Sequence, residues 1–321
     1  MEETIPTDLS LRYTTTTYPE LEESNYDRCP RVSEDVLIIA CVCSCISLCG
    51  LVGNVGVVWL LGFRMKQNPF TVYVLNLAIA DFLLLLILLA EFTFLLLSAV
   101  YCIDYGDFLL IDHSLFLLFL LGYFAGMYLL TAMSVEQCLA ALFPVWYQCH
   151  RPKHSSAIMC GVLWTLPALF VALVFLLDPF GSVFGHILYV LCIVNFVLFS
   201  FIPLLSNLAL YIKLRCGSQR RHLGKLYVAV LLSVLFVVLL GFPFSVESFL
   251  YHVYGRPFHI SFLLASLNSS INPVIYFLLG SCRQHRFQCS LTVAFQRLFE
   301  EGAANEERSQ VPGDAVMETC V

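Results

Sequence analysis

The sequence predicts an all-α membrane protein: a bundle of seven transmembrane helices, followed by a short amphipathic helix. Composition is the first observation, since hydrophobic residues make up 59% of the 321 residues and charged residues only 12%. Soluble domains contain roughly 45–50% and about 25% of these two classes. The mean hydropathy of +0.83 agrees. A soluble protein of this length would need far more charge to cover its surface.

Seven apolar runs are the second observation. A helix needs about 20 apolar residues to cross a bilayer. Runs of this kind cover residues 36–63, 70–98, 109–142, 156–177, 187–214, 224–251 and 259–280. The third and the sixth are the least sharply bounded. Together they predict one seven-helix membrane domain over residues 36–280.

Lysine and arginine predict the orientation, because they are enriched in short cytoplasmic loops. Thirteen of the 17 basic residues lie after the first, third, fifth or seventh run. We therefore expect a multi-pass protein of the plasma membrane, with its N-terminus outside and its C-terminus in the cytoplasm. Residues 1–35 are polar and acidic, so we expect no cleavable signal peptide there.

Three segments lie outside the predicted bundle. Residues 1–35 are acidic and are expected to form a disordered extracellular tail, with a ligand-capturing arm as the alternative. Residues 281–299 alternate basic and apolar side chains, which predicts an amphipathic helix bound to lipid on the cytoplasmic leaflet. Cys282 and Cys289 in it are candidates for S-acylation, and unmodified thiols are the alternative. Residues 300–321 are expected to be a disordered cytoplasmic tail.

Several function classes lose support from the sequence. A net charge of −6 gives no electrostatic basis for nucleic-acid binding. The chain contains no G-x-S-x-G or H-E-x-x-H motif, so we do not expect an enzyme. Internal repeats typical of transporters are not visible either. Most of the 14 cysteines lie in apolar runs, and no His or Cys spacing indicates a metal site.

Polar residues inside the apolar runs form a candidate switch site, since such groups are costly in lipid. The set comprises Asn54, Asp81, Asn268, Ser269 and Asn272, with Tyr276 one turn further along the last run. One interpretation is polar glue between helices, at about 1 kcal/mol per hydrogen bond. The alternative is a switch that depends on protonation of Asp81 or on a cation, such as sodium, bound near it.

Five motifs occur in order along these runs: Gly53-Asn54, Leu77-Ala78-Ile79-Ala80-Asp81, Trp164, Pro203 with Tyr211, and Asn272-Pro273-Val274-Ile275-Tyr276. All five on seven apolar runs resemble the rhodopsin-like G-protein-coupled receptors. A narrower resemblance, to the Mas-related receptors, is carried by Trp59–Met65, Asn68–Phe70, Cys138-Leu139, Leu142–Tyr147, Cys149–Pro152 and Leu267–Ser270.

The resemblance implies a receptor that passes an extracellular signal to heterotrimeric G proteins, with Glu136, Gln137 and Tyr211 facing the G protein. In most such receptors an arginine follows the acid, where this chain has Gln137. Without that ion pair we expect a weaker resting lock and detectable basal signalling. The alternative is a receptor-like membrane scaffold with little or no G-protein coupling.

Two further departures concern the sixth run and the disulfides. Gly241 stands two residues before Pro243, where the family usually has a tryptophan. We expect a soft hinge there and a void at the pocket floor.

The family's usual disulfide is missing, because Asp112 stands where its first cysteine would fall. Cys29 and Cys102, which we place outside the bilayer, either form a bridge of their own or remain free thiols.

Ligand pockets in such bundles open outward between the helices. The candidate ligand-binding residues are Glu91, Asp112, Tyr123, Tyr189 and Glu247. Some Mas-related receptors that bind basic peptides carry acids at two positions where this chain has Val174 and Tyr189 instead. The remaining acids still favour a cationic peptide or amine over an anionic or lipid ligand. The third interpretation is that these acids merely solvate the loops.

The last four residues, Glu318-Thr319-Cys320-Val321, have the spacing that PDZ domains recognise. Such domains add a peptide as a strand to a sheet edge and bind its terminal carboxylate. Val321 and Thr319 would point to the same side of that strand. We expect a cytoplasmic PDZ partner; the alternative is a tail that ends in valine by chance.

Overall fold

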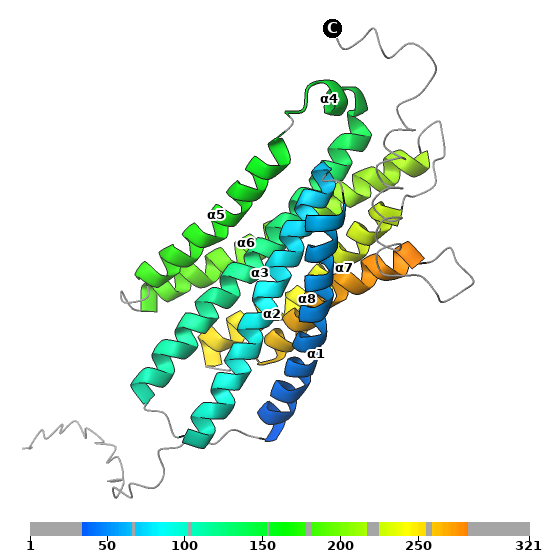
Figure 1. Cartoon of the computed structure of the whole chain (residues 1–321). Coiled ribbons are helices and arrows are strands. Elements are labelled where there is room, and N and C mark those ends of the chain that lie inside the picture. Colours follow the sequence, from blue (N-terminus) through cyan, green and yellow to red (C-terminus); the bar gives the residue numbers. More distant parts are fainter. Residues whose placement is uncertain are drawn as a thin grey trace, which may run out of the picture.

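The computed structural model describes residues 34–65, 68–101, 105–152, 154–177, 182–216, 225–254 and 259–281, and every regular element in these ranges is helical. The helices run in this order: α1 (Glu34–Trp59), η1 (Leu60–Arg64), α2 (Pro69–Tyr101), α3 (Tyr105–Leu142), α4 (Pro144–Cys149), α5 (Ser155–Leu177), α6 (Ser182–Cys216), α7 (Lys225–Tyr254) and α8 (His259–Ser281). Figure 1 shows them as an elongated bundle of long rods, with the short α4 at one end.

Each of the seven predicted runs coincides with one long helix. Six of them are long and apolar enough to cross a membrane, and the described part of α7 adds a shorter apolar stretch, Tyr227–Leu240. The sequence did not predict the π-helical turn η1, which ends α1, or the separate helix α4. Pro144 opens α4, where its missing N–H costs nothing.

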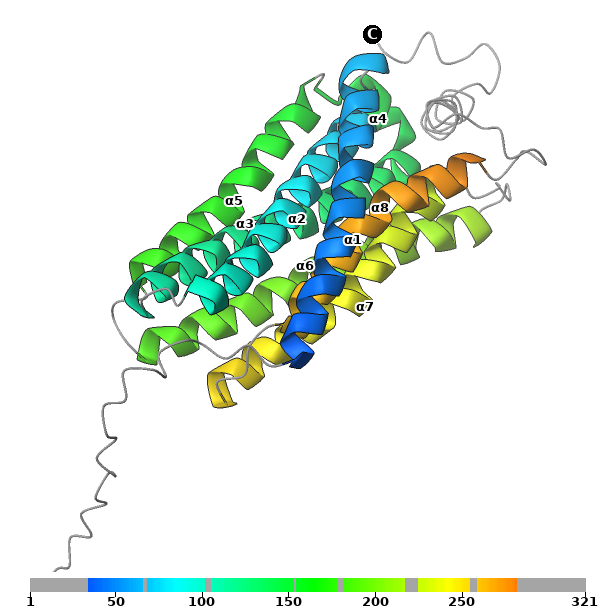
Figure 2. The same cartoon turned by 60° about the horizontal axis from the view of Figure 1, so that its bottom comes forward.

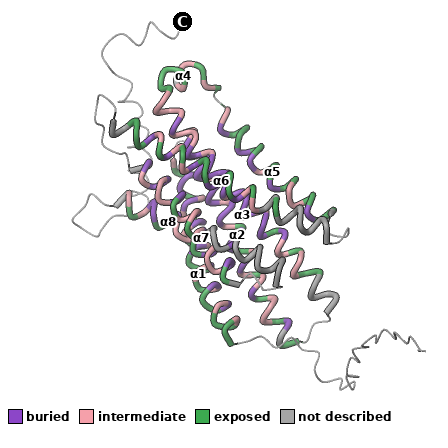
Figure 3. The backbone as a smooth tube through the Cα atoms, turned by 180° about the vertical axis from the view of Figure 1, so that it is seen from behind, coloured by how far each residue is buried: buried purple, intermediate pink, exposed green. Residues whose placement is uncertain are grey.

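The third membrane helix, α3, lies at the centre of the bundle. It packs against α2, α5, α6 and α7, while α1 packs against α2 and α8. In the most apolar window of α3, 67% of the residues are buried, against 22% for α1. Figure 2 shows α1 lying along α8, and Figure 3 shows buried residues concentrated in the middle of the bundle. The outward faces are apolar, as lipid requires.

Among the residues whose side chains are described, proline occurs inside three helices, as Pro167 in α5, Pro203 in α6 and Pro273 in α8. Each helix continues past its proline. A transmembrane helix tolerates proline when neighbouring groups satisfy the freed carbonyl. In α6, Pro203 frees the carbonyl oxygen of Phe199, four residues earlier, and the hydroxyl of Thr131 in α3 donates a 3.0 Å hydrogen bond to it.

The bundle has two ends with different contents. The end that holds η1, α4, the C-terminal end of α3 and the N-terminal end of α5 is named the α4 end. The opposite end holds the beginning of α1, the end of α2 and the beginning of α3. This division follows from the alternating direction of consecutive helices.

Candidate functional site

The predicted polar residues do come together, where α1, α2 and α8 meet. Asn272 donates a 2.8 Å hydrogen bond to Oδ2 of Asp81. Asn54 donates 3.1 Å to the carbonyl oxygen of Ser269 and 3.0 Å to that of Gly50. All of these side chains are buried. The bonds to Asp81 and to Ser269 join helices far apart in sequence, so they provide the glue between helices that one interpretation expected.

The close approach of α1 and α8 allows the side chains of this network to form hydrogen bonds with each other's helices. Ser270 donates a 3.1 Å hydrogen bond to the carbonyl oxygen of Ile46. A Cβ atom on Gly50 would overlap the Ser270 side chain, and one on Gly53 would lie 3.1 Å from Cβ of Pro273. Both glycines therefore let the two backbones meet closely, as small residues do in membrane bundles.

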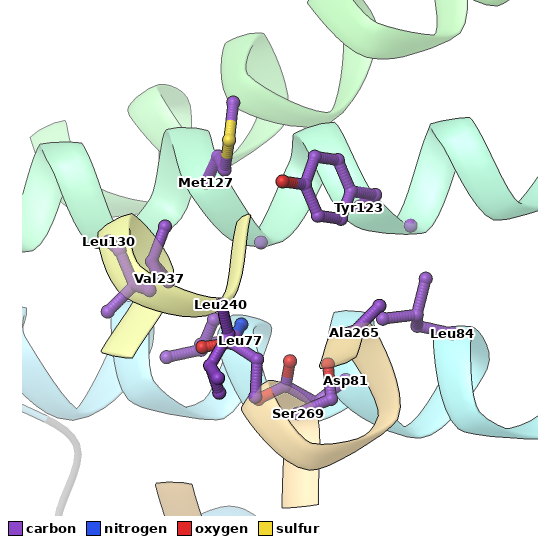
Figure 4. A pocket seen from close by; sticks show the side chains of 13 residues that line it. Leu77, Asp81, Leu84, Tyr123, Met127, Leu130, Val237, Leu240, Ala265 and Ser269 are labelled. Atoms are coloured by element: carbon purple, nitrogen blue, oxygen red, sulfur yellow. The ribbon is translucent and has the colours of Figure 1, made fainter. Parts of the chain in front are cut away.

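A small cavity of about 10 Å³ adjoins Asp81. Asp81, Asn268 and Ser269 supply its polar lining. Figure 4 shows Asp81 and Ser269 next to each other, with Tyr123 of α3 on the other side. Among the described residues, the amide oxygens of Asn268 and Asn272 are buried without a hydrogen-bond partner. A carboxylate beside unpaired amide oxygens suits a small hard cation or a water molecule.

Aromatic rings close the bundle next to this cavity. The ring of Tyr123 lies 4.9 Å from that of Phe244, measured between centroids, and Phe119 lies 4.9 Å from Phe262. Phe92 extends the cluster into α2. Phe244 of α7 is buried within this cluster, against Phe119 and Tyr123. Gly241 lies outside the described side chains, so the expected void at the pocket floor stays a prediction.

Two of the predicted ligand-binding acids meet at the opposite end of the bundle. The carboxyl groups of Glu91 in α2 and Asp112 in α3 lie within interaction distance of each other. One carboxyl oxygen of Glu91 is buried and has no hydrogen-bond donor among the described residues. Tyr123 lies eleven residues from Asp112, about 16 Å along α3, so it belongs to the central cavity instead.

At the α4 end, Glu136 has an ionic partner that the sequence analysis did not foresee. Arg151, which follows α4, forms an ion pair with Oε1 of Glu136. Tyr147 donates a 2.8 Å hydrogen bond to the same oxygen, and the Arg151 guanidinium lies 4.9 Å from the Tyr147 ring centroid. Arg151 also donates to Oγ of Ser156. The ion pair with the next residue is absent, as Gln137 requires, and the segment after α4 supplies a different cation that the sequence did not indicate.

A second group of polar contacts at this end was also missed. Tyr227 of α7 donates a 3.2 Å hydrogen bond to the carbonyl oxygen of Asn207 in α6. The Asn207 side chain donates 3.2 Å to Oγ of Ser134 in α3. Nearer the middle, Tyr128 and Asn195 are hydrogen-bonded at 2.8 Å, and Trp164 donates 3.1 Å to Asn76. Each of these contacts is made by a polar side chain within an apolar run. The sequence carried that signal, but only the polar residues most costly to bury in lipid were predicted to form a site.

The remaining predicted residues are distributed as follows. Tyr276 is buried in α8, while Tyr211 faces outward from α6 with 43% of its surface exposed. Gln137 is partly buried, and its amide oxygen lacks a partner among the described residues. Outside the described residues or side chains lie Tyr189, Gly241, Pro243, Glu247, Cys29, Cys102, Cys282, Cys289 and both terminal segments.

Comparison with known proteins agrees with this geometry. Residues 53–276 match the family model described as 7 transmembrane receptor (rhodopsin family). Rattus norvegicus Proto-oncogene Mas is 37% identical over 279 residues, which cover 82% of this chain and 84% of the relative. Mas-related G-protein coupled receptor member X2 of Macaca mulatta is 39% identical over 283 residues, covering 80% and 82%. Homo sapiens member X1 is 37% identical over 298 residues, 87% of each chain.

The family model covers more than half of the chain, and these relatives cover at least four fifths of it. The chain therefore belongs to the rhodopsin family of seven-transmembrane receptors, in its Mas-related group, and is a cell-surface G-protein-coupled receptor.

Proposed function

We propose that this receptor binds an extracellular cationic peptide or amine at the end opposite α4 and activates a heterotrimeric G protein at the α4 end. The juxtaposed carboxyl groups of Glu91 and Asp112 carry the proposal. Residues 67–150 contain no lysine or arginine, so neither α2 nor α3 supplies one to neutralise the pair. A cation placed between two carboxylates would relieve their repulsion and gain two charge-assisted hydrogen bonds.

The orientation is part of the same proposal. The basic residues Arg64, Arg151 and Lys213 all lie at the α4 end: Arg64 ends η1, Arg151 follows α4, and Lys213 lies in the last turn of α6. The positive-inside rule then places the α4 end in the cytoplasm and the two acids outside. Antibody access to a tag placed before residue 34 in intact cells tests the orientation; a tag reached only after permeabilisation would contradict it.

The ligand class is tested with matched cationic, neutral and anionic peptides applied to cells that express the receptor. We expect activation by cationic peptides, and a tenfold or greater rise in the half-maximal concentration for the double variant Glu91→Gln, Asp112→Asn, about 1.4 kcal/mol per tenfold. Asp35→Asn is the control, because this acid lies in the first turn of α1 and is not part of the Glu91–Asp112 pair. The cationic assignment would be refuted if an anionic or lipid ligand activated the receptor and activated the double variant at the same half-maximal concentration.

A receptor-like scaffold without coupling is the second candidate, and Gln137 favours it. The side chain carries no charge, and its buried amide oxygen has no partner in the described part of the chain. Guanine-nucleotide exchange in vesicles containing the purified receptor and G protein separates the two functions. Nucleotide exchange faster than in receptor-free vesicles supports coupling. No increase in exchange, in the presence of a ligand that is shown directly to bind the receptor, supports the scaffold.

We also propose that sodium binds beside Asp81. The support is the carboxylate, the unpaired amide oxygen of Asn268 and the cavity between them. A cavity of about 10–15 Å³ is the smallest that holds one water-sized particle. Thermal unfolding in NaCl against choline chloride tests this proposal. We expect sodium to raise the Tm of the natural protein and of Asp35→Asn, but not of Asp81→Asn; an equal effect on all three would refute the site.

A further inference from the structure

A larger cavity of about 260 Å³ lies at the α4 end, beside the Glu136–Arg151 ion pair and away from Asp81 and from the Glu91–Asp112 pair. Its walls come from α2, α3, α4, the segment after α4 and the first turns of α5. The volume corresponds to about nine water molecules at roughly 30 Å³ each. It is therefore large enough for a ten-carbon chain or for one end of a bulkier molecule.

The walls of this cavity, named the α4 cavity, are mainly apolar. Ala132, Val135 and Leu139 of α3 line one side, and Trp146 and Met159 line the other. Trp146 and Met159 are 49% and 43% exposed, so they stand at its margin. Neighbouring Ile158 is 65% exposed and apolar, as expected for a surface in contact with lipid. The cavity thus opens next to hydrocarbon, and an apolar guest has a direct route into it.

The polar end of the α4 cavity has no net charge. Glu136 and Arg151 both line it, and they neutralise each other in their ion pair. A carboxylate or phosphate could reach Arg151 only by displacing Glu136 from the ion pair, and an ammonium group could reach Glu136 only by displacing Arg151. Ser155 also lines the cavity, and its hydroxyl oxygen is buried without a hydrogen-bond partner among the described residues. A neutral hydroxyl group satisfies this oxygen without disturbing the ion pair.

We propose that the α4 cavity binds a neutral membrane amphiphile, with a hydroxyl head at Ser155 and an apolar body between Val135, Trp146 and Met159. Long-chain alcohols and sterols share this chemistry. The ligand would bridge α3, α4 and α5 and so hold the ion-paired segment in place. The binding itself does not depend on the proposed ligand class or on G-protein coupling, so it is tested on the receptor alone.

The experiment uses the full chain in phosphatidylcholine nanodiscs and a photoreactive diazirine dodecanol as the probe. We expect saturable labelling, one probe per chain, on peptides that carry Leu139, Trp146 or Met159. Dodecanol competes with the probe, whereas dodecanoate and dodecylamine do not. Cholesterol is the further competitor that distinguishes a ring-shaped guest from a chain. Displacement by dodecanoate equal to that by dodecanol would overturn the neutral head.

Variants locate the site. Ala132→Phe fills the cavity and should reduce labelling at least tenfold; Met159→Trp, at the exposed margin, does the same if the first variant fails to fold. Ser155→Ala removes a hydroxyl that has no internal partner, so it should weaken binding about three- to tenfold without lowering the Tm. Val162→Phe is the control, since Val162 faces outward on α5 and does not line the cavity. Equal labelling of Ala132→Phe, Met159→Trp and Val162→Phe would show annular lipid contact only and overturn the proposal.

Discussion

Arg151 and Glu136 form an ion pair that joins the segment after α4 to the end of α3. The side chains are only 9% and 15% exposed, so water screens the pair weakly. In relatives of this fold an arginine next to the acid is the expected partner, and here Gln137 occupies that position. The acid is nevertheless neutralised, with the difference that its cation belongs to a loop. Movement of that loop would therefore separate the two side chains and leave Glu136 without its charge partner.

Loss of this ion pair should raise basal coupling. In Arg151→Gln, the Glu136 carboxylate keeps Tyr147 as a donor but loses its charge partner. The cost should be roughly 1–3 kcal/mol, between values for exposed and buried pairs. We expect a lower Tm and a several-fold increase in ligand-free guanine-nucleotide exchange, because α4 is less firmly attached.

Two comparisons make that result specific. Arg64→Gln removes a positive charge at the same end, from an exposed side chain that lies over Trp59, and should change neither quantity. The double variant Glu136→Gln, Arg151→Gln leaves no unpaired charge, so it should recover part of the lost Tm. A double variant as unstable as the sum of its two single variants would show that the pair makes no net contribution.

Restoring an arginine at Gln137 should act mainly on the stimulated state. Glu136 already has Arg151, so a second cation adds only about 0–1 kcal/mol to the resting pair. A charged side chain at 137 would, however, be new to a bound G protein. Second-messenger assays of Gln137→Arg should show a larger change in ligand-stimulated output than in basal output. If neither output changes, position 137 does not influence coupling.

The sequence predicted the bundle well because its signal is physical and local. Twenty apolar residues must form a helix in lipid, whatever surrounds them. The same reasoning placed Asp81 and Asn272 together, since buried polar groups in lipid find one another. It could not place Arg151 beside Glu136, because that contact depends on how the chain turns at Pro144. Nor could it predict the α4 cavity, whose volume depends on the packing of four separate helices.

Gly50 should be intolerant of any side chain. An added Cβ would meet Ser270 and would lie 2.7 Å from Cδ1 of Leu85. Relief of that overlap requires α1 to move away from α8 and to weaken the Asn54 bond to Ser269. We expect Gly50→Ala to cost about 1–3 kcal/mol, as overpacking usually does, which a thermal unfolding assay in detergent would detect.

Gly56 supplies the matched control for that measurement. It lies in the same helix, and a Cβ there would have no heavy atom within 4 Å. Alanine also favours helix over glycine by up to about 1 kcal/mol. Gly56→Ala should therefore leave the Tm unchanged or raise it slightly. If both variants lose stability equally, glycine is needed for something other than the approach of α1 to α8.

Tyr227 should restrain α7 at the α4 end. Its hydroxyl donates to the Asn207 carbonyl, and Asn207 in turn donates to Ser134, so one chain of hydrogen bonds joins α7, α6 and α3. Any separation of α7 from α6 must break the first of these bonds. A hydrogen bond of this kind contributes about 0.6 kcal/mol in a membrane bundle, equivalent to roughly a threefold shift in a two-state equilibrium.

Tyr227→Phe keeps the ring and should raise ligand-free nucleotide exchange by about that factor. Tyr101→Phe removes a hydroxyl from an exposed side chain at the opposite end, and should leave exchange unchanged. Exchange in Tyr227→Phe that equals the natural level, with the variant fully folded, would mean that α7 is held in place by packing alone.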